Sequence, residues 1–131
     1  MIFVDTDVLA AHQRGDQSAT DALRGLVASG ENLATTSVNV AELFHGAERV
    51  GDRKAAIGSV LLLLDGLVHV PFGPGAARRF GSLMAALHRA GRPMPPMDGL
   101  VAAVVLENGG RLLTRNRRHF IHIPGLELID E

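Results

Sequence analysis

The stretch that decides the fold is "IFVDTDVL", residues 2–9, in which an apolar run is followed at once by two acids. Residues 2–4 are β-branched or aromatic, and a run of this kind and length predicts a short buried strand. Asp5 and Asp7 stand one residue apart where that strand ends. Two acids at the end of a buried strand are the first indication of a functional site.

The composition limits the class of protein before any motif is considered. At 131 residues, 47% hydrophobic and 21% charged, the chain is expected to form one globular domain, residues 1–131. The absence of Cys excludes disulfides, thiolate zinc sites and a cysteine nucleophile. The longest apolar stretches are much shorter than a membrane span and no signal peptide is recognisable, so we expect a soluble cytoplasmic protein.

Charge is unevenly distributed along the chain, although the net charge is only −1. Residues 1–70 carry 5 basic and 9 acidic residues, and residues 71–119 carry 8 Arg and 2 acids. The last segment, residues 120–131, carries 3 acids and no Arg or Lys. Two interpretations stay open: the acidic and Arg-rich parts meet at a cleft that binds a metal and a polyanion, or the charges cover solvent-exposed faces.

Apolar periodicity and turn residues alternate between strand and helix patterns. Strands are predicted at 2–5, 32–37, 67–72, 111–114 and 126–129, and helices at 8–15, 17–30, 37–50, 53–66, 73–91 and 97–110. Ser37 is placed to cap one helix, and Asp7 is a candidate cap for another. Strands separated by such helices favour parallel βα units. The predicted fold class is α/β, a three-layer α/β/α domain around a mostly parallel sheet of four to five strands.

In parallel sheets, ligands bind beyond the carboxyl ends of the strands, so polar residues just past those ends are the candidate site. The residues that meet this test are Asp5, Asp7, Thr36, Ser37, Glu42, Thr114 and Asn116, and Asp98 precedes the helix that leads into the strand at 111–114. Three acids, Asp5, Glu42 and Asp98, and one amide are therefore expected to converge on one edge of the sheet.

Converging carboxylates raise one another's pKa unless a positive charge compensates them, and a hard divalent cation such as Mg²⁺ or Mn²⁺ is the simplest compensation. Structural roles are the alternative. The helix dipole stabilises an acid in the first turn of a helix, the position expected for Asp98, and an asparagine such as Asn116 is common in turns. Glu42, on an apolar helix face, is harder to explain as a solvated residue. Four of the six histidines lie inside helix or strand patterns, and His119 and His122 are expected to contact substrate rather than act as bases.

Four ordered segments carry a family resemblance. They are "VDTD" (4–7), "TTSVNVAEL" (35–43), "MDGLVAAVV" (97–105) and "LLTRNRRHF" (112–120). In order and spacing the chain resembles the PIN-domain ribonucleases, most closely the VapC-type toxins of toxin–antitoxin pairs. The resemblance covers essentially the whole chain and implies a Mg²⁺- or Mn²⁺-dependent endoribonuclease, which hydrolyses phosphodiester bonds of RNA with a metal-activated water.

Carried over by position, the resemblance assigns the metal-binding acids to Asp5, Glu42 and Asp98. The fourth acidic position of the family falls at Asn116, which removes one ligand charge and weakens the case for a second ion. Thr114 matches the hydroxyl that orients the attacking water. Asp7 is expected to start the next helix and to tune the charge of the metal pocket, and Asp7 and Thr6 are expected to support the site rather than to bind the metal.

The resemblance also implies partners. Arg92, Arg115, Arg117 and Arg118 are expected to hold RNA phosphates, which positions a strand without reading its sequence. The chain has no Trp or Tyr and therefore few aromatic side chains on which RNA bases could stack. The shape of a structured RNA such as tRNA or rRNA is the expected basis of specificity. A VapB-type antitoxin is expected to wrap the toxin. A homodimer is also expected, and two interpretations of the apolar segments at 57–67 and 80–88 stay open: they supply its interface, or they are buried in the core of the monomer.

Two other functions fit parts of the sequence. "VDTDVL" also resembles the opening of haloacid-dehalogenase-type phosphatases, in which Asp5 is the nucleophile and Asp7 a general acid/base. That family needs a later Lys and an acidic pair, whereas the only lysine is Lys54 and no acidic pair follows residues 111–114. The second alternative is a PIN-like module that binds RNA or protein without cutting, and the presence of all three principal acids argues against it.

Overall fold

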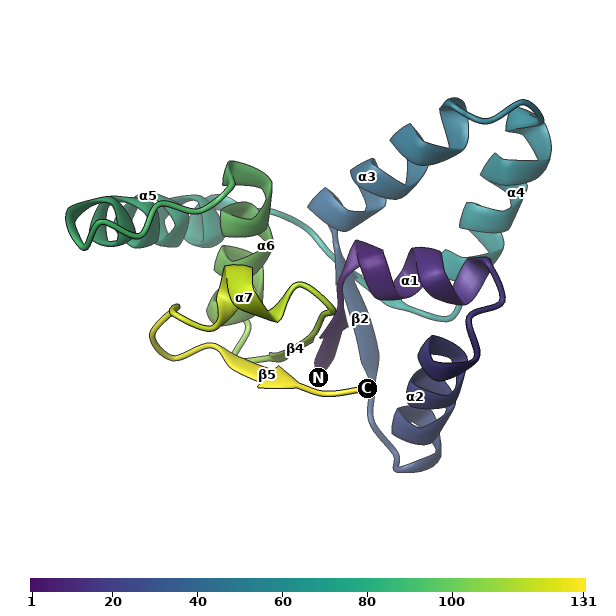
Figure 1. The fold of residues 1–131 in the computed structure, drawn as a ribbon, viewed down its shortest axis with the longest axis horizontal. Coiled ribbons are helices and arrows are strands. Elements are labelled where there is room, and N and C mark those ends of the chain that lie inside the picture. The colour runs from purple at the N-terminus through teal and green to yellow at the C-terminus, as the bar shows by residue number, and fades with distance from the viewer.

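A computed structural model describes all residues, 1–131, and has a parallel five-stranded sheet at its centre (Figure 1). The strands are β1 (Ile2–Val4), β2 (Leu33–Thr36), β3 (Val68–Val70), β4 (Arg111–Leu113) and β5 (Glu127–Ile129). Their order is β3-β2-β1-β4-β5, and every pairing is parallel. The run that opened the sequence analysis is therefore the central strand.

Seven helices surround the sheet. They are α1 (Thr6–Gln13), α2 (Gln17–Ala28), α3 (Ser37–Glu48), α4 (Arg53–Leu64), α5 (Pro74–Arg89), α6 (Pro96–Glu107) and α7 (Arg117–Phe120). Figure 1 shows α5, α6 and α7 on one side of the sheet and α1 to α4 on the other. The predicted α/β/α layering is confirmed, and only the short α7 has no counterpart among the predicted helices.

The central strand joins two apolar cores, one on each face of the sheet. Phe3 and Leu112 belong to the core beneath α5 and α6, whereas Ile2, Val4 and Leu113 belong to the core beneath α1 and α4. This division follows from the strand geometry, because successive side chains point to opposite faces. All three residues of β1 are completely buried, so the site at its carboxyl end rests on the most enclosed part of the molecule.

Two predicted helix caps are wrong. Asp5, not Asp7, is the N-cap of α1, and its Oδ1 accepts the backbone N–H of Thr6. Thr36, not Ser37, caps α3 and forms a capping box with Asn39. In both cases the strand enters the helix without a loop, so the last extended residue becomes the cap. The two helices therefore begin at the edge of the sheet where the site was predicted.

The two segments expected to supply a dimer face differ in exposure. On α5, Leu83 and Leu87 are buried in the core beside α6, so the segment at 80–88 is not a free apolar face. On α4, Leu61 is 54% and Leu62 is 74% exposed. Only the α4 segment leaves large apolar side chains available to a partner. None of the helices is long and apolar enough to cross a membrane.

Gly110, just before β4, allows the chain to pass close to the ring of Phe3. A Cβ at this position would lie 2.6 Å from Phe3 Cε2, and Phe3 is completely buried and has no room to move. Gly110→Ala is expected to lower the free energy of unfolding by about 1–3 kcal/mol, measured by urea denaturation. Gly81→Ala on the exposed face of α5, where a Cβ meets nothing within 4 Å, is the control and is expected to stabilise by about 0.5–1 kcal/mol. Equal effects of the two changes would contradict this packing.

Candidate active site

The centre of the site is the carboxylate of Asp5, directly after β1. Its side chain is 5% exposed and accepts three side-chain or backbone hydrogen bonds. Oδ1 accepts from the Thr6 N–H and from Asn39 Nδ2, each at 2.9 Å, and Oδ2 accepts from Thr114 Oγ1 at 2.7 Å. All three donors are neutral, so no positive charge of the protein is bonded to this buried acid.

Asn39 connects Asp5 to the second predicted acid. It is completely buried, and its Nδ2 donates both to Asp5 and, at 2.9 Å, to Thr6 Oγ1. Thr6 Oγ1 in turn donates to Glu42 Oε1 at 2.9 Å. Asn39 and Glu42 lie three residues apart on α3 and therefore share a face of that helix. Thr6 is thus the link between the Asp5 and Glu42 carboxylates.

Asn39 is a site residue that the sequence analysis missed. Its signal was an amide within the otherwise apolar pattern of α3, one turn before Glu42. Its Oδ1 accepts from Thr36 Oγ1 at 2.8 Å, which fixes the direction of the amide and leaves Nδ2 facing the site. The amide that completes the capping box is therefore the same group that holds Asp5.

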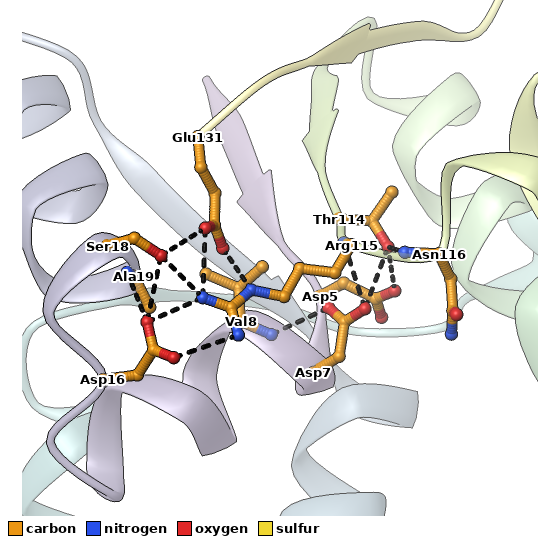
Figure 2. A network of polar contacts seen from close by, with 10 residues as sticks. All are labelled: Asp5, Asp7, Val8, Asp16, Ser18, Ala19, Thr114, Arg115, Asn116 and Glu131. Carbon is orange, nitrogen blue, oxygen red and sulfur yellow. Dashed lines mark hydrogen bonds and ion pairs between the residues drawn. The ribbon is translucent and has the colours of Figure 1, made fainter.

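The segment after β4 closes the other side of Asp5 (Figure 2). Thr114 Oγ1 donates to Asp5 and accepts the backbone N–H of Asn116 at 3.0 Å. Asp7 accepts the backbone N–H of Arg115 at 3.0 Å and that of Val8 at 2.7 Å. Asp7 therefore ties this segment to α1, while the side-chain amide of Asn116 makes none of the contacts drawn in Figure 2.

Asp98, in the first turn of α6, has a histidine as its partner. Its Oδ2 lies 2.8 Å from Nδ1 of His119 on α7, and the two side chains are 21% and 29% exposed. From the sequence, His119 was expected to contact substrate. In the structure its contact is with one of the predicted metal-binding acids, which gives the unpredicted helix α7 a place in the site.

Burial controls the electrostatics of the site. The pKa of Asp5 is raised to about 6, chiefly by desolvation; the Thr114 and Thr6 hydrogen bonds lower it, and the neighbouring charges of Asp7 and Asp98 add to the increase. Burial also raises the pKa of Asp7. A buried carboxylate with neutral donors and acidic neighbours fits a hard cation, which takes oxygen ligands. No three acidic or histidine side chains lie close enough together to form a metal cage by themselves.

The four arginines predicted to hold phosphates divide into two pairs. Arg115 is bound by two acids: its Nη2 lies 2.7 Å from Asp16 Oδ1, and its Nε contacts Glu131 (Figure 2). Its guanidinium lowers the pKa of both carboxyls. The guanidinium of Arg115 therefore holds the start of α2 to the end of the chain.

Arg117 is also paired with an acid, at 2.8 Å from Asp130 Oδ1. Arg92 instead donates to Nδ1 of His122, and Arg118 is exposed and bonds to no acid. Arg92 and Arg118 are thus the two members of the predicted set whose charge is not neutralised within the chain.

Comparison with known proteins adds to this geometry. The PIN domain family model matches residues 2–126. Ribonuclease VapC10 of Mycobacterium tuberculosis is 36% identical over 120 residues, 92% of this chain and 86% of that protein. The tRNA(fMet)-specific endonuclease VapC of Shigella flexneri is 30% identical over 104 residues, 75% of this chain and 74% of that protein.

Solved structures agree on the fold. The crystal structure of VapBC2 from Rickettsia felis, bound to a DNA fragment from its promoter, superimposes with a TM-score of 0.91 at 23% identity. The superposition covers 100% of this chain and 99% of the other. Together, the family model that spans nearly the whole sequence and the 36% identical relative show that this chain belongs to the PIN-domain family, as a protein of the VapC type.

Proposed function

We propose that this protein is a divalent-metal-dependent endoribonuclease and the toxin of a toxin–antitoxin pair. The observation that carries the proposal is the Asp5 carboxylate, which is buried, bonded only to neutral donors and flanked by Asp7 and Asp98. With a pKa of about 6, Asp5 is mostly ionised at neutral pH, and a bound cation would compensate its charge. The relatives that share the fold are named ribonucleases or endonucleases, which supports RNA as the substrate.

Asp5, Glu42 and Asp98 would hold Mg²⁺ or Mn²⁺, both of which accept carboxylate oxygens and retain bound water. When bound, the ion supplies Lewis-acid chemistry that makes hydroxide available from water near neutral pH. With a neutral amide at Asn116 in place of a fourth acid, the site holds one negative charge fewer and favours a single ion at rest.

The surrounding residues orient the acids. Asn39 fixes one oxygen of Asp5 and also the Thr6 hydroxyl, which fixes Glu42. Thr114 fixes the other oxygen of Asp5 and is itself held by the Asn116 N–H, and its hydroxyl would orient a water beside that carboxylate. Partners of this kind commonly change metal affinity or activity about 10–100-fold when they are removed.

We propose a structured RNA, such as tRNA or rRNA, as the substrate and a VapB-type antitoxin as the partner. One relative is named for tRNA(fMet), and the superimposed structure contains VapB together with VapC. An apolar groove of about 720 Å³ between α1, α2 and the end of α4 is lined by Leu9, Leu23, Val27, Leu62 and Leu67. Such a groove suits an apolar segment of the antitoxin. Because Leu62 lines this groove, a homodimer formed beside a bound antitoxin would use the other exposed leucine of α4, Leu61.

The phosphatase alternative is not favoured by the comparisons or by the geometry. Lys54, the only lysine, is exposed in the first turn of α4 and bonds to no residue of the site. A non-catalytic PIN module remains the alternative that a cleavage assay tests.

Cleavage of total cellular RNA with Mg²⁺ or Mn²⁺ tests the proposed activity and its site. Wild-type protein is expected to cleave and chelator to stop the reaction, because the acids act through the ion. Asp5→Asn and Asp98→Asn are expected to abolish cleavage, whereas Asp7→Asn keeps much of it, since Asp7 bonds the backbone of the β4 segment. Full activity of Asp98→Asn would refute the site assignment. Absence of cleavage of any cellular RNA would favour the non-catalytic module.

Two buried polar residues close together in the chain, Asn39 and Thr35, test the role of the hydrogen bonds to Asp5. Asn39→Leu removes the donors to Asp5 and Thr6 and is expected to weaken Mn²⁺ binding, measured by calorimetry, about 10–100-fold. Thr35→Val is the matched control because the buried Thr35 hydroxyl has no partner. It is expected to leave Mn²⁺ affinity unchanged and to stabilise the fold by about 1 kcal/mol. Unchanged Mn²⁺ affinity in a folded Asn39→Leu protein would contradict the role of Asn39.

A further inference from the structure

A small basic pocket lies between the end of α5 and α7. It has a volume of about 240 Å³, and its polar lining is Arg92, Arg118, His119 and His122, with no acidic residue. Met94 and Ile123, both almost fully buried, form part of its floor. The pocket therefore has a buried apolar floor, and all of its polar side chains are Arg or His.

The local sequence explains why the pocket is rigid. Gly91 has a φ of 69° and turns the chain out of α5, a conformation that favours glycine. Pro93 and Pro95 then restrict the backbone of the segment that leads to α6. Arg92 lies between Gly91 and Pro93, so its backbone is constrained on both sides.

The donors of the pocket are available to a ligand. Arg92 Nη1 donates to Nδ1 of His122, and because a guanidinium never accepts, His122 carries its N–H on Nε2. Arg118 is exposed and has no acidic partner, unlike Arg117, which is paired with Asp130. Two guanidinium groups in one pocket without a counter-ion are a binding site for an anion, most favourably a phosphate with its fork of oxygens.

The pocket adjoins the candidate metal site. His119 lines it, and the same imidazole contacts Asp98 Oδ2 at 2.8 Å. A nucleic-acid strand bound at Asp98 would therefore continue past His119 to Arg92 and Arg118. At about 240 Å³ the pocket is smaller than the roughly 300–1,000 Å³ of small-molecule sites, which favours a phosphodiester group over a larger ligand.

We propose that this pocket binds a backbone phosphate of the substrate strand next to the phosphate that is cut. The choice of RNA as the ligand rests on the proposed function. The pocket holds the strand in register with Asp98, and it does so without reading bases, because phosphate contacts carry no sequence information. Arg92 and Arg118 provide this contact, whereas Arg115 and Arg117 are engaged with acids of the chain.

The test measures binding of a single-stranded RNA oligonucleotide by fluorescence anisotropy in chelator, where no cleavage takes place. Arg92→Ala and Arg118→Ala are each expected to weaken binding about tenfold, the effect of losing one charge-assisted contact. Each is also expected to reduce the slope of log affinity against log salt by about 0.7, the value for one lost phosphate contact on a single strand. Arg78→Ala is the matched control, since Arg78 is exposed on α5 and has no acidic partner, and it should change neither quantity.

The outcomes separate this inference from the proposed function. Wild-type affinity and salt slope in both Arg92→Ala and Arg118→Ala would overturn the pocket, even if the protein cleaves RNA. Reduced affinity and slope in these two variants, with Arg78→Ala unchanged, would support the pocket even if no cleavage is found. An equal loss in all three variants would also overturn it, because the effect would then be that of net charge.

Discussion

The structure depends on one buried charge, the carboxylate of Asp5 at the end of the central strand. Asp5 directly follows β1, caps α1 and accepts hydrogen bonds from residues of α1, α3 and the segment after β4. The junction between strand and helix is therefore also the centre of the site. A change at this carboxylate would alter the fold locally and the chemistry together.

Burial of the ionised Asp5 carboxylate lowers the free energy of unfolding. A pKa raised from 3.8 to about 6 corresponds to about 3 kcal/mol of unfavourable free energy for the ionised form. This cost remains although Asp5 already accepts hydrogen bonds from the neutral donors Asn39, Thr114 and the Thr6 N–H. A bound cation would compensate this charge. The hydrogen-bond network and the proposed metal site therefore act on the same carboxylate.

Much of the fold and part of the site could be predicted from the sequence. The apolar run at residues 2–4 specified the central strand, and the rule for carboxyl ends of parallel strands placed Asp5 and Thr114 together. Asn39 was missed because an amide in an apolar helix has no local signature of its purpose. The partners of Arg115 could not be predicted, since Asp16 lies 99 residues away in the chain and only the folded sheet brings them together.

The most direct test of the buried charge is the free energy of unfolding of wild type and Asp5→Asn between pH 4 and pH 8. In chelator, wild type should lose stability from about pH 4 to about pH 6, because unfolded Asp5 releases its proton at lower pH than folded Asp5. At pH 7 the variant should be more stable by up to about 3 kcal/mol, and Mn²⁺ should stabilise wild type only. Identical pH profiles, or equal stabilisation of both proteins by Mn²⁺, would contradict the account.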